Sequence, residues 1–542
     1  MSFGYATATD DTWATGMDDI NALLSGTQWE SNEVRYSFTS NFKYDYELSY
    51  LNSDSYKSSF KSLNEDQREA IYDWVAMYED VSLLDMVELT GSENDKNATI
   101  RIAKSLETAH AFFPDDIRVE AGDIWFNHDD YEEPTLGNHT FVTFGHEIGH
   151  ALGLEHGHEE NGVSNVALNY YRDSMEFSIM TYRSYVGEQI EEYNDEGYPN
   201  EDWGYAQSLM MYDIRAIQQM YGANFDTNSG DTIYRFSPST GEMLVNGMGQ
   251  GTPGDNRIFR TIWDGDGIDT YNFDNYTTNL AIDLEPGGWS DLDVGGYNQK
   301  ADLGDGHDAR AHVFNALTYY GDSRSLIENA VGGSGDDSIT GNVKANTLIG
   351  AYGSDTVDGG FGEDLIYGDN TDNYSWGDAD DLYGGVDDDI IYGGGGNDSI
   401  EGNSGIDLVD GQGGNDIVIG GSSTDTVDGG SGNDTLIGSY PNSSISGSGE
   451  YDRLTGGSGA DNFVLGDSEK TYYQDFGYAI VTDFDYLEKD KFIASGSYSN
   501  YSLEYSDWIG GFALDTIVEY EGDVIAIVED NTNVLMLDFT FV

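Results

Sequence analysis

The apolar positions of residues 1–225 recur with two different periods. In the stretch SLNEDQREAIYDWVAMYEDV, residues 62–81, they follow the period of an amphipathic helix, and Ser62 three residues before Glu65 predicts a capping box. The stretch 210–222 has the same helical period and stops at Gly222, which predicts a second helix with a glycine C-cap.

Two further segments alternate apolar and polar residues as half-buried strands do. They are ATIRIA at 98–103 and GDIWFN at 122–127. The first 225 residues therefore predict a mixture of helices and strands. From about residue 226 the helical period vanishes, and short alternating segments separated by Gly, Asp and Asn predict a β-rich continuation.

A nine-residue repeat begins at Gly332 and continues as far as residue 467. Its first periods read GGSGDDSIT, GNVKANTLI, GAYGSDTVD and GGFGEDLIY, and after an insertion the frame resumes at Ser375. The glycines allow tight turns, and the apolar residue at the eighth place, as in Ile339 and Leu382, can fill the interior of a coil. A disordered linker rich in Gly and Asp is the alternative, but it would not keep an apolar position in phase.

An aspartate recurs at the sixth place of nearly every period. Stacked carboxylates repel one another unless cations with oxygen ligands lie between the turns, so the repeat predicts calcium sites. The array resembles the RTX nonapeptide GGxGxDxUx, which implies a calcium-bound parallel β-roll of a secreted protein. Asn346 replaces the aspartate in one period, which is expected to bind calcium poorly or not at all. The candidate calcium ligands are Asp337, Asp355, Asp364, Asp380, Asp389, Asp398, Asp407, Asp416, Asp425, Asp434, Asp452 and Asp461.

The charge of the chain is consistent with bound cations and excludes one class of partner. Against 23 Lys and Arg stand 100 Asp and Glu, a formal net charge of −77. Binding to a nucleic-acid backbone requires a surplus of Lys and Arg that the chain lacks. The acidity outside the repeats fits either a saline habitat or further calcium sites, and GDGIDTYNF at 265–273 is one candidate for such a site.

The absence of cysteine excludes disulfides and thiolate metal sites. We expect no membrane span, because no run of eighteen apolar residues occurs. We also expect no N-terminal signal peptide, because MSFGYATATDDTWATG has neither a basic nor an apolar region.

The histidines are concentrated in HEIGHALGLEH, residues 146–156. His146 and His150 are four residues apart, so on a helix their rings project from one face and can share one metal ion. Gly153 can break the helix and let His156 reach the same ion. Three neutral imidazoles with an open position predict a catalytic zinc site, in which Glu147 can take a proton from the metal-bound water.

The segments around this motif resemble the serralysin branch of the metzincin metalloproteases. They are AHAFFP (109–114), GDIWFN (122–127), SIMTY (178–182) and DIRAIQQMYGAN (213–224). The resemblance implies a Met-turn at Met180 beneath the zinc site, and a tyrosine, Tyr182, that can approach the metal and stabilise the oxyanion. It also implies an edge strand that pairs with an extended substrate, formed by Ala109, His110, Ala111 and Phe112.

The resemblance covers roughly residues 20–467 and implies an α+β metzincin-like catalytic domain followed by an all-β parallel β-roll. The predicted domains are an N-terminal segment or short propeptide (1–25), a zinc metalloprotease domain (26–225), a β-rich connection (226–331), the RTX β-roll (332–467) and a C-terminal β-rich cap with a type I secretion signal (468–542).

The implied function is that of a secreted zinc endopeptidase, with Glu147 as general base and structural calcium in the repeats. It would cleave extended protein or peptide substrates, leave the cell through a type I secretion apparatus and act as a monomer. Two alternatives stay open: a calcium-dependent surface or matrix protein with a vestigial protease domain, and a zinc hydrolase of esters or carbohydrate-linked amides. His158 is expected to be exposed to solvent, and His128 and His139 to lie at the surface or behind the ligands.

Overall fold

A computed structural model of the chain describes residues 8–42, 46, 54–91, 95–189, 198–370, 377–441, 447–511 and 513–542. The first seven residues of the predicted N-terminal segment, and Ser375 in the repeat, lie outside the described residues. The chain divides into two compact units, which share the predicted connection 226–331. Unit 1 comprises Met1–Asp269, Pro286–Asp291 and Gly295–Leu326, and unit 2 comprises Thr270–Glu285, Leu292–Val294 and Ile327–Val542.

Unit 1 is built on a five-stranded sheet with the strand order β4-β3-β5-β7-β6. Neighbouring strands are parallel except for β6, which pairs antiparallel with β7 and is the last strand on its side. The predicted strands at 98–103 and 122–127 are confirmed as β5 and β7. The bounds are β3 Glu33–Phe38, β4 Asp85–Glu88, β5 Ile100–Ser105, β6 His110–Ala111 and β7 Ile124–Asn127.

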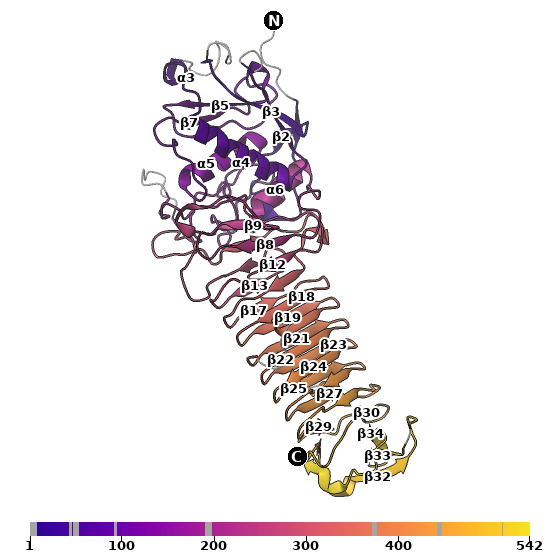
Figure 1. Cartoon of the computed structure of the whole chain (residues 1–542). Coiled ribbons are helices and arrows are strands. Elements are labelled where there is room, and N and C mark those ends of the chain that lie inside the picture. Colours follow the sequence, from indigo (N-terminus) through magenta and orange to yellow (C-terminus); the bar gives the residue numbers. More distant parts are fainter. Residues whose placement is uncertain are drawn as a thin grey trace. The chain divides into compact units, whose positions relative to one another are not determined.

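The helices of unit 1 carry the predicted amphipathic segments (Figure 1). The segments 62–81 and 210–222 are confirmed as α4 and α6, and α6 ends at Gly222 as expected. The bounds are α1 Asp18–Asn21, α3 Asp54–Ser59, α4 Glu65–Val81, α5 His139–Leu152 and α6 Met211–Tyr221.

The capping box of α4 lies two residues after the predicted one. The side chain of Asn64 accepts a 2.8 Å hydrogen bond from the backbone N–H of Gln67, and the Gln67 side chain accepts one of 2.9 Å from the N–H of Asn64. Ser62 instead donates its hydroxyl to the backbone carbonyl of Thr39 at 3.1 Å. The predicted pair of Ser62 and Glu65 is therefore wrong, because a tertiary contact uses the Ser62 hydroxyl.

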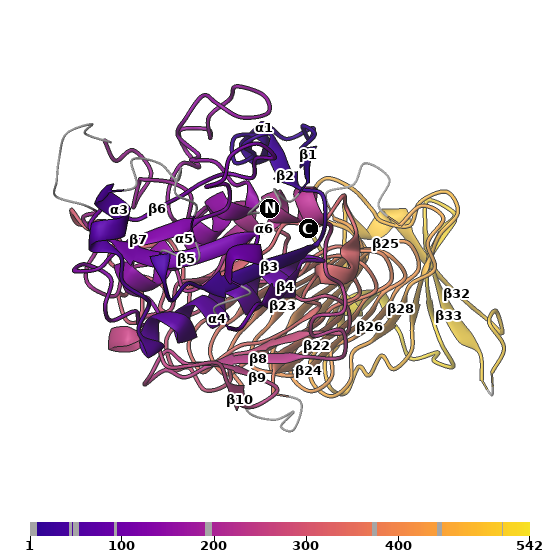
Figure 2. The ribbon, with the colours of Figure 1, turned by 90° about the horizontal axis from the view of Figure 1, so that it is seen from above.

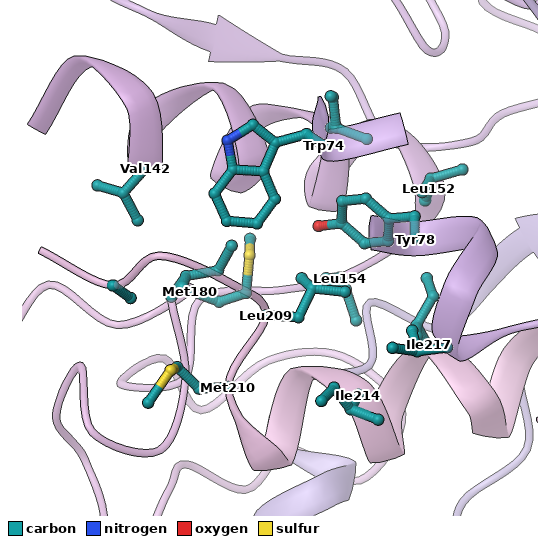
Figure 3. Packing of buried hydrophobic residues seen from close by; sticks show 14 of the residues in the cluster. Trp74, Tyr78, Val142, Leu152, Leu154, Met180, Leu209, Met210, Ile214 and Ile217 are labelled. Carbon is teal, nitrogen blue, oxygen red and sulfur yellow. The ribbon is translucent and has the colours of Figure 1, made fainter. Parts of the chain in front are cut away.

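The core of unit 1 lies where α4, α5 and α6 meet. Figure 3 shows Trp74 and Tyr78 of α4 facing the side chains of Met180 and Leu154, with Ile214 and Ile217 of α6 beyond them. Trp74 and Tyr78 are fully buried, and both anchor α5 by hydrogen bonds, Trp74 Nε1 to the Phe141 carbonyl and Tyr78 OH to the Gly145 carbonyl. Apolar burial and these two bonds fix the helix that bears the candidate zinc ligands.

The rest of unit 1 forms short strands. β1 pairs antiparallel with β2, β9 lies between β8 and β10 in a meander, and β15 lies between β11 and β14. The bounds are β1 Thr9–Asp11, β2 Thr27–Trp29, β8 Ile233–Phe236, β9 Met243–Val245, β10 Met248–Gly249, β11 Arg260–Ile262, β14 Trp289–Ser290 and β15 Val313–Asn315.

Unit 2 winds its repeats into two parallel sheets, with consecutive repeat strands alternating between them. β22, β24, β26 and β28 are successive strands of the first sheet, and all four are labelled in Figure 2. Its strands are β12 Thr270–Asn272, β16 Asn329–Val331, β18 Thr347–Ala351, β20 Leu365–Asp369, β22 Ile390–Gly395, β24 Leu408–Gly413, β26 Thr426–Asp428, β28 Arg453–Thr455 and β30 Ala479–Val481.

The second sheet has ten strands, all parallel to their neighbours. They are β13 Ala281–Asp283, β17 Ser338–Thr340, β19 Thr356–Phe361, β21 Asp381–Val386, β23 Ser399–Ser404, β25 Ile417–Ser422, β27 Thr435–Ser439, β29 Asn462–Val464, β31 Lys491–Ala494 and β35 Phe539–Phe541.

The eighth residue of each period fills the interior, as predicted. Val357 pairs with Leu382 in the second sheet and Ile366 with Ile391 in the first, and all four are 0% exposed. Both sheets continue beyond residue 467. The first ends in an antiparallel meander that follows β30, formed by β34 Asp523–Val528, β33 Asp515–Tyr520 and β32 Tyr501–Ser506.

The helices that the structure describes are too short, or too polar, to cross a membrane. The expected architecture of an α+β domain followed by a parallel β-roll is confirmed.

Candidate metal centre

Helix α5 presents two of the three predicted zinc ligands. Asn138 caps its N-terminus by accepting a 2.8 Å hydrogen bond from the backbone N–H of Phe141. Gly153 ends it with a φ of 114°, and a Cβ there would lie 2.4 Å from the carbonyl oxygen of Thr27. Only glycine accommodates both the left-handed conformation and the close approach, so the predicted helix break is confirmed.

The turn after Gly153 brings His156 back to the two histidines on α5. The Nε2 atom of His156 lies 3.3 Å from that of His146 and 2.9 Å from that of His150. One ligand atom from each of the three residues lies within 4.8 Å of the other two. Three nitrogens facing one point match the donor set of a catalytic zinc ion, which keeps a further position open.

The other nitrogen of each ring makes a hydrogen bond that selects the tautomer. His146 Nδ1–H donates to the Ile179 carbonyl and His150 Nδ1–H to the Leu154 carbonyl, each at 2.7 Å. His156 Nδ1–H lies 3.2 Å from a carboxylate oxygen of Glu159. Carbonyl and ionised carboxylate oxygens only accept, so all three Nε2 lone pairs face inward.

Burial keeps the three imidazoles neutral. Burial, together with nearby histidines, lowers the pKa of His146 to about 4 and that of His156 to about 3. The pKa of His150 is held well below its usual value by the same causes. Since only neutral imidazole binds a metal, the cluster is ready for an ion at neutral pH.

Glu147 is buried beside this cluster. It is 5% exposed, and its Oε2 atom has no hydrogen-bond partner among the described residues. Burial raises the pKa of its carboxyl to about 8. A carboxyl group with a pKa near neutrality can both take up and release a proton at working pH.

Met180 and Tyr182 both lie close to the histidines. A Cβ at Gly149 would lie 2.8 Å from Met180 Sδ, so the fully buried methionine packs against α5 between the two helical ligands. The ring of Tyr182 lies 4.4 Å from that of His156, and the residue is 42% exposed. Burial, with Glu147 nearby, raises the pKa of Tyr182 to about 12, so its hydroxyl stays a hydrogen-bond donor.

The predicted substrate strand lies at the edge of the sheet of unit 1. His110 and Ala111 form β6, and Phe112 continues the pairing with β7 by accepting from Gly122 N at 2.9 Å. The next residue, Phe113, packs its ring edge-on against His150 at 5.3 Å. The segment 109–114 therefore runs past a candidate zinc ligand, and Phe113 is a site residue that the sequence reasoning missed.

His158 is half-buried, so the expectation that it faces solvent is wrong. Its ring stacks on His156 at 5.5 Å and lies 4.9 Å from Tyr182. The chain turn at Gly157 folds it back over the site. His128 contacts Lys61 and Asp129, and His139 packs among tyrosine rings; neither belongs to the candidate ligand cluster.

In unit 2 the sixth-position aspartates form two ladders along the roll. The backbone N–H of Asp380 donates to Asp398 Oδ1 at 3.0 Å, and that of Asp389 donates to Asp407 Oδ1 at 2.9 Å. Each carboxylate thus binds the turn before it with one oxygen. The second oxygen is buried without a hydrogen bond among the described residues in Asp355, Asp364, Asp380, Asp389, Asp398, Asp407, Asp416, Asp425 and Asp434.

The buried second oxygens of these aspartates support the predicted calcium sites. Burial, together with neighbouring aspartates, raises the pKa of Asp380 to about 9 and that of Asp416 to about 8. A buried row of like charges is unfavourable unless a cation lies against it. A Cβ at Gly368 would lie 2.3 Å from Asp380 Oδ2, so the glycines leave room beside the carboxylates.

The ends of the ladders differ from their middle. Asp337 Oδ2 accepts from Gly333 N at 2.6 Å, and Asp452 Oδ2 accepts from the Tyr473 hydroxyl at 2.6 Å. Asn346 Oδ1 accepts from Asn342 N, which satisfies the amide without a cation. Asp461 N donates to Asp490 Oδ1, so the ladder extends to Asp490, which the sequence analysis did not predict. The signal was present in the stretch KDKFI, which places an aspartate before a strand as the repeats do.

The candidate site near 265–273 also contains buried carboxylates. Asp264 and Asp269 are 1% and 0% exposed, and burial raises the pKa of both. A Cβ at Gly267 would lie 2.9 Å from the Gly230 carbonyl oxygen and 2.8 Å from Asp269 Oδ1. Carbonyl and carboxylate oxygens thus approach the Gly267 backbone closely, and such oxygens are the ligands calcium takes.

Both parts of the chain match known protein families. Residues 28–181 match the Matrixin family of M10 peptidases. The RTX calcium-binding nonapeptide repeat matches over 331–366, 340–375, 377–409, 401–436 and 442–468. The fold and site therefore define a Matrixin domain joined to RTX repeats, for which zinc and calcium are the expected cofactors.

The relatives found are of the same kind. The chain is 33% identical over 246 residues to Serralysin G of Dickeya chrysanthemi, covering 44% of each chain. It is 30% identical over 322 residues to Serralysin C of the same organism, covering 57% of this chain and 60% of that one. A Serralysin of Proteus mirabilis is 31% identical over 265 residues, 48% and 46% of the two chains. The chain is thus similar to serralysins over part of its length, and it spans about half the length of the relatives it matches.

Proposed function

We propose that the chain is a zinc endopeptidase that cleaves extended polypeptides. The observation that carries the proposal is the convergence of the Nε2 atoms of His146, His150 and His156 beside the buried carboxyl of Glu147. Three neutral nitrogen ligands with an adjacent acid–base group are typical of a catalytic zinc site. A structural zinc site would have a fourth protein ligand.

Zinc, when bound, lowers the pKa of water and polarises a carbonyl group. Glu147 then accepts the proton of the attacking water and passes it to the leaving amine, since its raised pKa suits both steps. Tyr182 donates its hydroxyl proton in a hydrogen bond to the oxyanion. The substrate backbone extends the sheet along β6, beside Phe113 and His150.

The β-roll of unit 2 bears on how the protein folds and leaves the cell. Calcium held against the aspartate ladders would fold unit 2 where calcium is abundant and leave it unfolded where calcium is scarce. This supports export through a type I secretion apparatus, with a signal in residues 468–542, and action outside the cell. The net charge of −77 disfavours self-association, so we propose a monomer.

The test is casein hydrolysis by the full chain in millimolar calcium, with the zinc content measured in parallel. The Glu147→Gln variant should retain zinc and lose turnover, and Glu160→Gln, an exposed glutamate nearby, should behave as the parent. A parent that binds zinc without cleaving casein or unfolded proteins would favour a hydrolase of another bond. A folded parent without zinc would favour a calcium-dependent surface protein.

A further inference from the structure

Unit 1 contains a cavity that the zinc chemistry does not use. Its volume is about 1040 Å³, and its lining residues include residues of α4, the β8–β10 meander and β11. This volume is slightly above the range of small-molecule sites, about 300–1000 Å³. Much of its wall is apolar, with Met77, Leu136, Phe141, Met243 and Trp263 among the lining residues.

A buried arginine lines this cavity without a partner. Arg260 is 7% exposed, and within the described parts of the chain its side chain makes no hydrogen bond or ion pair. Tyr234, which also lines the cavity, is neutral and donates its hydroxyl to Asp264 at 2.6 Å. A buried guanidinium without an anion is unfavourable, so the site favours a ligand that brings a carboxylate.

The cavity wall formed by α4 has the opposite charge. Asp66, Glu69, Asp73 and Asp80 lie three, four and seven residues apart, on one face of the helix, and all four are exposed. This face favours a cationic group. The chain's net charge of −77 repels a ligand that carries only negative charge, so a zwitterion is preferred over a fatty acid.

We propose that this cavity binds a short apolar peptide with free termini, with its carboxylate on Arg260, its ammonium group toward the acidic face of α4 and its side chains against the apolar wall. Such peptides are the products of the hydrolysis proposed above, so the source of the ligand depends on the proposed function. Binding itself requires no turnover, so the two proposals can fail separately.

The test is calorimetry on the full-length Glu147→Gln variant in calcium and zinc, with a hydroxamate zinc ligand saturating the candidate active site. The probes are the tripeptide Leu-Ala-Leu, its C-terminal amide, its N-acetyl form and octanoate. We expect the free tripeptide to bind, and the amide and the N-acetyl form each to bind at least tenfold more weakly. Absence of binding by the tripeptide, or equal binding by the amide or the N-acetyl form, would overturn the proposal, as would tighter binding of octanoate.

Two variants separate binding from folding. Arg260→Met should abolish binding of the tripeptide while leaving the Tm equal or higher, because an unpaired buried charge is removed. Arg118→Gln removes an exposed arginine and should bind the tripeptide as the parent does. If Arg260→Met does not fold, the Tm of the parent decides: the tripeptide should raise it and the amide should not. A folded Arg260→Met variant that binds normally contradicts the proposal.

Discussion

The Nδ1–H of His146 donates a 2.7 Å hydrogen bond to the backbone carbonyl of Ile179, which joins α5 to the turn that bears Met180. Asp213 of α6 also holds this turn by hydrogen bonds. Asp213 accepts hydrogen bonds from Ile179 N at 2.8 Å, Ser178 Oγ at 2.6 Å and Met210 N at 2.9 Å. The orientation of one candidate zinc ligand therefore depends on a carboxylate that is distant from it in sequence.

Asp213→Asn should weaken zinc binding. An amide nitrogen would face a donor, shift the Ile179 carbonyl and loosen His146. Groups that orient metal ligands typically contribute about 10–100-fold in affinity, so we expect a loss in that range, measured by competition with a zinc-binding dye. Asp130→Asn, at an exposed aspartate, is the control. Unchanged zinc affinity in a folded Asp213→Asn variant would refute the link.

The same residue predicts a pH dependence of stability. Burial raises the pKa of Asp213 to about 7, against about 3.9 in an unfolded chain. The folded state binds this proton more tightly, so the stabilisation is complete below about pH 4 and is lost as the pH rises through 7, up to about 4 kcal/mol. The unfolding free energy of the parent minus that of Asp213→Asn should therefore decrease from pH 5 to pH 8 in urea titrations at fixed calcium. A constant or rising difference would contradict the assignment.

Glu159 should act as a positioning residue for His156. Two of the three ligands are oriented by carbonyl groups, whereas His156 has the Glu159 carboxylate at 3.2 Å. Glu159→Gln should lower zinc affinity roughly tenfold or more and leave kcat of the zinc-saturated protein nearly unchanged. Its neighbour Glu160, which is exposed, provides the matched Glu160→Gln control. Loss of kcat at full zinc occupancy would instead place Glu159 in the chemical step.

Tyr182→Phe should lower kcat on casein by about 10²–10³-fold, because one oxyanion donor is worth about 2.7–4 kcal/mol. KM and zinc content should stay close to the parent values, since the ring still packs on His156. Tyr171→Phe, at a residue that is 73% exposed, should be indistinguishable from the parent. A Tyr182→Phe variant with full activity would remove Tyr182 from the mechanism.

Calcium should stabilise unit 2 through the ladder aspartates. Excess chelator should lower the Tm, because bound calcium stabilises only the folded roll. Asp380→Asn removes a buried oxygen without a hydrogen bond and should reduce both the number of bound calcium ions and the Tm in calcium. Asp381→Asn, one residue later and exposed, should change neither. An unchanged Tm in chelator would defeat the prediction.

The candidate zinc ligands, the interior of the roll and the aspartate ladders could be predicted from the sequence, because each depends on local spacing. His146 and His150 share a face of any helix, and a nine-residue period repeats one environment in every turn. These features need only backbone geometry that neighbouring residues determine.

Other features were decided by tertiary structure, because their partners are remote in sequence. The Thr39 carbonyl accepts the hydrogen bond of the Ser62 hydroxyl, so Asn64 caps the helix instead. The turn at Gly157 stacks His158 on His156, near Tyr182. The orienting role of Asp213 and the isolation of Arg260 likewise depend on which segments pack around them. Spacing along the chain determined which side chains could meet an ion, and packing between distant segments determined which of them are held, buried or left without a partner.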